Sequence, residues 1–112
     1  MDTIEDNPLS RERFDEIAQE LAFRDGDVAP SKMFGMPCIK VNGKAFAGLH
    51  HGEMVFKLTG NAHAKALNLD GACLFDPAHM GRPMKEWVQV PFENADLWRE
   101  FAESALQYVG KK

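Results

Sequence analysis

The residue types that could hold a metal ion gather at two places in the chain. The denser place is His50-His51-Gly52-Glu53, which offers two imidazoles and one carboxylate. Adjacent histidines on an extended segment point to opposite faces, so both can bind one ion only where the chain bends. A turn at this point would supply that bend. A pair of solvent-exposed turn histidines explains the same residues without a metal, and we favour it.

The second place holds a looser set of ligand types. Cys73, Asp76 and His79 occupy a segment that runs from a strand into a loop, and they would need a fourth group to bind zinc. A buried Cys73 and a loop His79 are the simpler interpretation. Cys38 and Cys73 form no CxxC pair, which argues against a redox pair and a four-cysteine zinc site. We expect two buried free thiols.

Nucleophilic catalysis requires a serine, threonine or cysteine within reach of a base. Ser10 and Ser104 lie on or beside expected helices, and Ser31 lacks the G-x-S-x-G elbow. A cysteine and a histidine could meet only through the tertiary fold. The sequence contains no Walker or G-x-G-x-x-G pattern that would cradle a nucleotide. We therefore expect no enzyme, no catalytic residue, no cofactor and no bound metal.

A single local pairing joins basic and aromatic residues. Arg82 and Lys85 flank a Pro-Met pair and are followed by Trp87. These three side chains could contact an anion or a protein partner. We favour the alternative, a loop tucked under the sheet with Trp87 in the core.

Charge and length limit the classes of partner. The chain has 112 residues, with 13 Lys and Arg against 17 Asp and Glu, which gives a net charge of -4. This is the wrong sign for tight contact with phosphates, so we expect no nucleic-acid partner. The apolar runs are far shorter than the roughly 20 residues of a spanning helix. We predict one cytoplasmic domain over residues 1–112, with its core at about 8–110, and no membrane contact.

The first expected element is a helix over about residues 8–24. Its apolar residues recur at helical spacing, and its acidic residues take the opposite side. Asn7-Pro8 supplies a cap and a first-turn proline, and Gly26 supplies a stop. The apolar stripe comprises Phe14, Ile17, Ala18, Leu21 and Ala22.

Residues 28–58 contain short apolar runs punctuated by glycines. Asn42-Gly43 is the strongest short hairpin signal, because both residues tolerate the positive φ of a type I′ turn. His51-Gly52 is a weaker signal at a fitting position. The segment predicts three strands, with residues 28–33 as an optional leading strand. With two-residue loops, the expected pairs are Ile39–Phe46, Cys38–Ala47, Ala47–Phe56 and Leu49–Met54.

This register sorts the side chains of the sheet onto two faces. The expected core face collects Met36, Cys38, Ala45, Ala47, Leu49, Met54, Phe56 and Leu58, interrupted by Lys40. The other face collects Pro37, Ile39, Val41, Phe46 and Val55, with Lys44 and Lys57. The second face is more apolar than a solvated sheet face needs to be. We therefore expect Ile39, Val41, Phe46 and Val55 to form an interface, either in a homodimer or with another protein; the alternative is a monomer that buries this face within the chain.

The remaining elements complete an α+β pattern. We expect a short helix near 60–69, strands at 72–75 and 86–90, and a last helix capped by Asn94 and stopped by Gly110. The last helix carries the stripe Leu97, Trp98, Phe101, Ala102, Ala105, Leu106 and Val109. The order α-βββ-α-ββ-α, with strands in two groups, predicts an antiparallel sheet with helices on one face.

Three pieces of the sequence carry a family resemblance. They are Met33-Phe34-Gly35, the run from Val41 to Ala47, and Gly81-Arg82-Pro83-Met84 followed by Trp87 and Val90-Pro91. In this ordered set the chain resembles the N-terminal domain of the bacterial competence regulator TfoX, also called Sxy, over about residues 12–109. The resemblance implies an α+β fold akin to the YjbR-like and type III secretion chaperone-like group, and no established active site.

The full-length regulator carries a separate C-terminal domain and is implicated in switching on competence genes together with the cyclic-AMP receptor protein. The present sequence has no such second half, so we do not carry the competence role over. We expect a small interaction module that regulates through protein contacts and has no chemistry of its own. The rival hypothesis is a metal- or small-molecule-binding protein, or an enzyme, that uses His50, His51 and Glu53 or the segment from Cys73 to His79.

Overall fold

Three glycine-containing turns build most of the sheet. The computed structural model describes residues 8–77 and 81–110. In it, Phe34-Gly35, Asn42-Gly43 and His51-Gly52 each have positive φ at both residues, as type I′ turns require. Two of these turns were predicted. The third, at Phe34-Gly35, joins the optional leading strand of residues 28–33 to the rest of the sheet.

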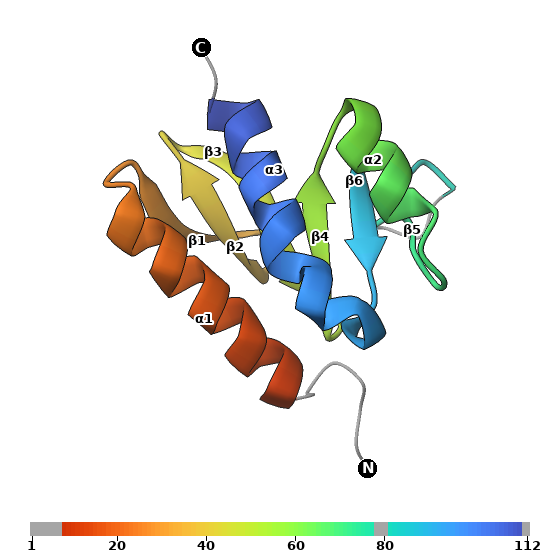
Figure 1. Ribbon diagram of the computed structural model, residues 1–112, viewed down its shortest axis with the longest axis horizontal. Helices are drawn as coiled ribbons and strands as arrows, with labels where there is room; N and C mark the ends of the chain where they lie inside the picture. Colours follow the sequence, from red (N-terminus) through yellow and green to blue (C-terminus); the bar gives the residue numbers. More distant parts are fainter. Residues whose placement is uncertain (1–7, 78–80, 111–112) are drawn as a thin grey trace.

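The elements follow the predicted order, with the leading strand included (Figure 1). They are α1 (Pro8–Arg24), β1 (Val28–Met33), β2 (Met36–Val41), β3 (Lys44–His50), β4 (Glu53–Lys57), α2 (Gly60–Leu67), β5 (Cys73–Phe75), β6 (Met84–Val90), the 3-10 helix η2 (Phe92–Leu97) and α3 (Trp98–Gly110). The strands form one antiparallel sheet in the order β1-β2-β3-β4-β6-β5. The α+β prediction is confirmed.

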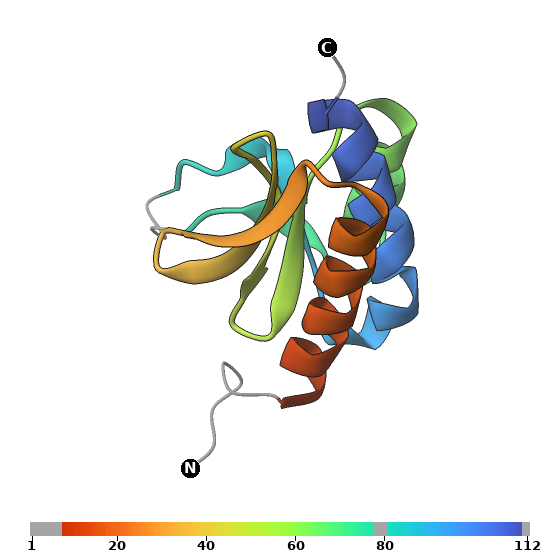
Figure 2. The same ribbon diagram turned by 90° about the vertical axis from the view of Figure 1, so that its left-hand side faces the viewer.

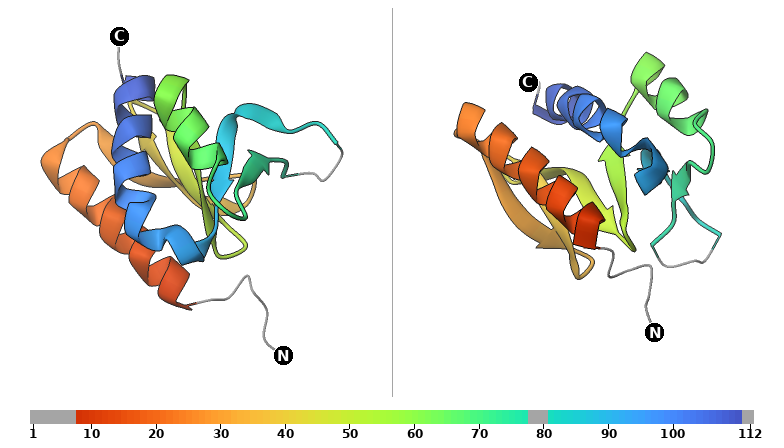
Figure 3. Two further views of the ribbon diagram at one scale, coloured as in Figure 1. Left: turned by 45° about the vertical axis from the view of Figure 1, so that its right-hand side comes forward. Right: turned by 60° about the horizontal axis from the view of Figure 1, so that its bottom comes forward.

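The helices lie on one face of this sheet, as predicted (Figures 2 and 3). The predicted stripes of α1 and α3 pack against the strands in a single core. We call it the helix-side core; its sheet members are Val28, Ile39, Val41, Phe46, Ala47, Leu49, Met54, Phe56, Val88 and Val90, with Leu58 just beyond β4. Within the described residues, no helix is both long and apolar enough to cross a membrane.

The register between β2 and β3 was predicted wrongly. Ile39 pairs with Ala47 instead of Phe46, and Cys38 pairs with Gly48 instead of Ala47. Phe46 is the extra residue of a β-bulge, which lets two successive residues of β3 face the same way. The predicted pairs between β3 and β4 are confirmed, because no bulge interrupts that hairpin.

The bulge reverses the predicted faces of β2. Without it, Lys40 would point into the core beneath the helices. With it, Lys40 pairs with Ala45 on the opposite face, and Ile39 and Val41 enter the helix-side core. Burying two β-branched apolar side chains in place of a lysine more than offsets one irregular ladder position.

The expected interface residues are therefore not a surface. Ile39, Val41 and Phe46 belong to the helix-side core, and Val55 is buried on the other face; none is more than 3% exposed. The exposed patch on which the homodimer expectation depended does not form from these residues. Edge pairing gains no support either: β1, at one edge, contains Pro30 and Lys32, which discourage addition of another strand.

The face turned away from the helices carries a smaller core. Met36, Val55, Phe75 and Trp87 are buried there, and Met33, Ala45 and Met84 pack against them. We call this set the second-face cluster. None of the described helices covers it; instead the sheet curls, and the β1–β2 hairpin bends away from the helices (Figure 2). The turn at one end of the strand order thereby reaches the strand at the other end, with the Phe34 and Phe75 rings 6.5 Å apart.

The start of the last helix also differs from the prediction. Asn94 was expected to cap it, but Asn94 lies inside η2 with φ -109° and ψ 26°, and α3 begins at Trp98. The Phe92 ring meets the Trp98 ring edge-on at 5.8 Å. Packing of Phe92 against the helix-side core winds this segment into a 3-10 turn before the α-helix starts.

Gly48 should be required by the second-face cluster. A Cβ at this position would lie 2.6 Å from Met36 Cε and 3.2 Å from the carbonyl oxygen of Pro37. We expect Gly48→Ala to lower the free energy of unfolding by about 1–2 kcal/mol. Urea denaturation measures this, with Gly26→Ala as the control, because a Cβ at Gly26 meets nothing within 4 Å. Equal stabilities of the two variants would contradict the prediction.

Phe46→Glu should unfold the chain. The substitution places a carboxylate at a fully buried position in the helix-side core, at a cost of several kcal/mol. Circular dichroism should show loss of structure, whereas Phe23→Glu, at a side chain that is 92% exposed, should stay folded. A folded Phe46→Glu variant would show that this ring lies on an outer face.

Candidate functional site

Phe34 combines backbone strain with exposure. It occupies the first position of its turn with φ 51°, the same left-handed conformation as Asn42 and His51. Asparagine and histidine are enriched in this conformation, but phenylalanine is not. The left-handed conformation costs phenylalanine about 1–2 kcal/mol. The Phe34 side chain is 65% exposed, so burial within the chain offsets little of that cost.

A hollow of about 420 Å³ lies beside this ring. It separates the first turn of α1 from the β1–β2 and β3–β4 turns. We call it the Phe34 hollow; it is lined by Pro8, Arg11, Phe34, Gly35, Met36, Pro37, Leu49, His50, His51 and Gly52. Residues from three separate parts of the chain thus meet at one surface.

The two adjacent histidines lie at the mouth of the β3–β4 turn, as predicted, but they stack on each other. Their ring centroids are 4.0 Å apart and the rings are 13° from parallel. Imidazole lone pairs lie in the ring plane, and two nearly parallel planes cannot meet at an ion about 2.0–2.1 Å from each nitrogen. Glu53, the third residue of this set, accepts a hydrogen bond from Gln89 Nε2 at 2.7 Å. This arrangement does not direct the three side chains at one ion.

The second predicted ligand set is also dispersed. Cys73 was expected to be buried but is exposed on β5, an edge strand of the sheet. The Asp76 carboxylate accepts a hydrogen bond from the Gly81 backbone N–H at 3.0 Å. His79 lies outside the described residues. No group of three potential ligands occurs within residues 8–77 and 81–110.

Neither thiol is activated by its surroundings. Burial raises the pKa of Cys38, which the neighbouring Lys40 lowers only in part. Partial desolvation, together with the Glu53 carboxylate, raises the pKa of Cys73. Both thiols therefore stay protonated at neutral pH, whereas a cysteine nucleophile needs a lowered pKa.

The members of the basic and aromatic trio predicted around β6 differ in burial. Arg82 and Lys85 are exposed. The interpretation that places Trp87 in the core is confirmed: Trp87 is 6% exposed and packs in the second-face cluster, with its ring 6.4 Å from the ring of Phe75. Strand alternation places Trp87 on the face opposite to Val88 and Val90, which take the helix side, and the second-face cluster buries it there. Trp87 is therefore a core residue and not a surface contact.

A larger hollow of about 720 Å³ lies near the end of α3; of the predicted site residues, Val41 alone is among its described lining residues. Asp25, Asp27, Thr59 and Tyr108 are among the residues that line it. The Tyr108 hydroxyl donates a hydrogen bond to Glu86 Oε2 at 2.7 Å, and this bond, with some desolvation, raises the pKa of Tyr108. The carboxylates that line this hollow and the hydrogen-bonded hydroxyl of Tyr108 show no arrangement for nucleophilic chemistry.

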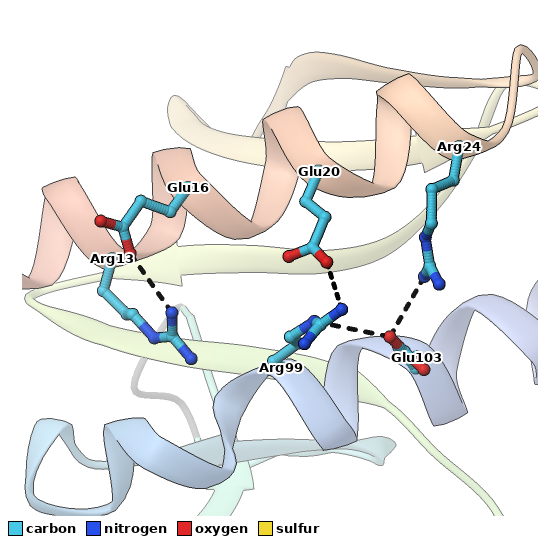
Figure 4. Close-up of polar contacts among 6 residues, drawn as sticks. All are labelled: Arg13, Glu16, Glu20, Arg24, Arg99 and Glu103. Carbon is cyan, nitrogen blue, oxygen red and sulfur yellow. Dashed lines mark hydrogen bonds and ion pairs between the residues drawn. The ribbon is translucent and has the colours of Figure 1, made fainter.

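Ion pairs hold α1 beside α3 and so fix one wall of the Phe34 hollow. The two helices run in the same direction (Figure 4), and Arg99 pairs with both Glu20 and Glu103. Glu103 also forms an ion pair with Arg24, at 3.1 Å. These side chains are roughly half exposed, so each pair contributes about 0–1 kcal/mol. The apolar stripe of α1 supplies most of the attachment.

Comparison with known families supports the resemblance seen in the sequence. The model of the TfoX N-terminal domain matches residues 19–108, which is most of the chain. The chain belongs to the TfoX N-terminal domain family. No curated protein and no solved structure matches it in these comparisons.

This TfoX N-terminal domain contains a site residue that sequence reasoning missed. Met33-Phe34-Gly35 was noted only as part of the family pattern. A signal was present, because an aromatic residue before glycine stands between two short strand-like runs, where a type I′ turn prefers Asn-Gly. Reading the motif as a turn would have placed the Phe34 ring at a hairpin tip.

Replacing Phe34 by asparagine should stabilise this TfoX N-terminal domain. Asparagine tolerates the left-handed conformation, and the ring that is lost makes one edge contact with Phe75. We expect Phe34→Asn to raise the free energy of unfolding by roughly 0.5–1 kcal/mol. Urea denaturation measures the change, and Asn42→Phe, at the equivalent turn position, should lower stability. A less stable Phe34→Asn variant would mean that the ring is held for packing.

Proposed function

We propose that this TfoX N-terminal domain is an interaction module that regulates a protein partner through the surface around Phe34, with no chemistry of its own. The observation that carries the proposal is the strained, exposed ring of Phe34 beside a hollow. A conformation that costs stability and buries little within the chain points to a role outside the fold. Exposed aromatic residues at the edge of a hollow are typical anchors of protein interfaces.

Other exposed apolar side chains lack this combination. Phe23 is 92% and Leu9 58% exposed, but both lie on α1 in ordinary helical geometry. Scattered exposed apolar residues of this kind are normal on a protein surface. Phe34 differs because asparagine or glycine at its position would favour the turn.

We also place the domain in the cytoplasm. Both cysteines are free, and Cys73 is exposed, which is usual for proteins of reducing compartments. A regulatory role fits a small domain whose described nucleophiles and potential ligands lie apart. Regulation here means that binding through Phe34 changes the activity of the partner.

Differential capture tests the proposal. Tagged wild-type domain, Phe34→Asn and Phe23→Asn are used as baits in lysate of the source cells, and captured proteins are quantified by mass spectrometry. We expect a partner retained by Phe23→Asn and reduced at least about fivefold by Phe34→Asn, since an interface anchor contributes upwards of about 1 kcal/mol. Phe34→Asn is expected to be the more stable variant, so unfolding does not explain a loss.

The captured protein is then purified, and its affinity for the three baits is measured by calorimetry. The same ranking with purified components supports a direct contact through Phe34. A partner set that Phe34→Asn leaves unchanged, or that Phe23→Asn removes equally, overturns the proposal.

A further inference from the structure

The Phe34 hollow has walls of two chemical kinds. Phe34, Pro37 and Leu49 supply flat or aliphatic surface on the sheet side. Arg11 supplies a guanidinium from the first turns of α1. A hollow of about 420 Å³ is within the range of small-molecule sites and admits one side chain or one small organic group.

The charge of the hollow is opposite to that of the chain. The chain has a net charge of -4, yet no acidic residue lines this hollow among the described residues. The hollow near the end of α3 contains Asp25 and Asp27, and another contains Glu53, Asp70 and Glu93. The described lining therefore presents a cation and no carboxylate to an anion; the Asp15 carboxylate, which pairs with Arg11, lies outside that lining.

Arg11 can accept a second carboxylate. The ion pair of Arg11 with Asp15 joins Nε to Oδ1 at 3.1 Å, so the terminal amino groups of the guanidinium remain for another acceptor. The side chains of this pair are 58% and 45% exposed, and solvent screening keeps the pair weak. A ligand carboxylate therefore competes only with this weak ion pair for Arg11.

We infer that the Phe34 hollow binds an organic carboxylate with a flat apolar group next to it, with the carboxylate on Arg11 and the apolar group against Phe34. The inference rests on the proposed function and names the chemistry that a partner would present there. An arginine fork beside an aromatic ring recognises a planar acid by charge and by stacking together. A peptide carboxyl terminus and a free small acid both offer this chemistry.

Nitrogen-15 NMR titration of the full chain tests the inference with phenylacetate as the probe. Phenylacetamide has the same ring without the charge, and phenethylamine reverses the charge. We expect phenylacetate to shift the backbone amides of Phe34, Gly35, His51 and Gly52 with a Kd of about 1 mM, as suits a fragment of this size. The amide should bind at least about fivefold more weakly, which is the share expected of one charged contact.

Arg11→Gln provides the decisive variant, with Arg24→Gln as its matched control. Arg24 lies at the other end of α1, is similarly exposed, and also forms an ion pair. We expect Arg11→Gln to weaken phenylacetate at least about fivefold and Arg24→Gln to leave it unchanged. No saturable shift at 10 mM phenylacetate, equal binding of the amide, or equal loss in both variants overturns the inference.

Two further probes identify the source of the carboxylate. N-acetylphenylalanine imitates a peptide carboxyl terminus, and its amide is the uncharged control. Tighter binding of N-acetylphenylalanine than of phenylacetate assigns a peptide terminus, and the reverse assigns a small free acid; either result supports the carboxylate chemistry. The capture experiment tests the proposed function separately. If Phe34→Asn loses the partner but no acid binds, the interaction module is supported and the carboxylate chemistry is not.

Discussion

The closure of the second face depends on the Phe75 ring. This fully buried residue lies on the last strand of the sheet order, and its ring meets the rings of Phe34, His50 and Trp87 at 6.5, 5.0 and 6.4 Å. A sheet with all its helices on one side must cover its other apolar side or expose it. Curling brings the β1–β2 turn onto β5, so the sheet covers that side with its own ends. The Phe34 hollow is a product of the same closure.

The bulge at Phe46 decides what the helices cover. It admits Phe46 and Ala47 together to the helix-side core and moves Lys40 to the opposite face. Gly48, the next residue, leaves room for Met36 in the second-face cluster. One inserted residue thereby divides apolar side chains between the two cores, and the surface that a regular hairpin would have exposed disappears.

The candidate site has the character of a recognition surface. Its features are an exposed aromatic ring, a single arginine and two stacked imidazoles around a shallow hollow. These groups are suited to holding a flat anionic group, whereas the described thiols are protonated and the potential metal ligands point apart.

The sequence by itself determined the elements, their order and the helix-covered antiparallel sheet, because these depend on local signals: the stripe of Phe14, Ile17 and Leu21, the Asn42-Gly43 turn, and the glycine stops. It could not determine which face of β2 is buried. A bulge is chosen by comparing the burial of Ile39 and Val41 with that of Lys40 across the whole sheet, and no local pattern records that comparison. Trp87 was weighed both as a surface contact and as a core residue, and only its tertiary packing against Phe75 decided for the core. The sequence could not predict the Phe34 hollow either, since its walls come from α1, β2 and β3. Only the curled tertiary structure brings Arg11 and the Phe34 ring to the same hollow.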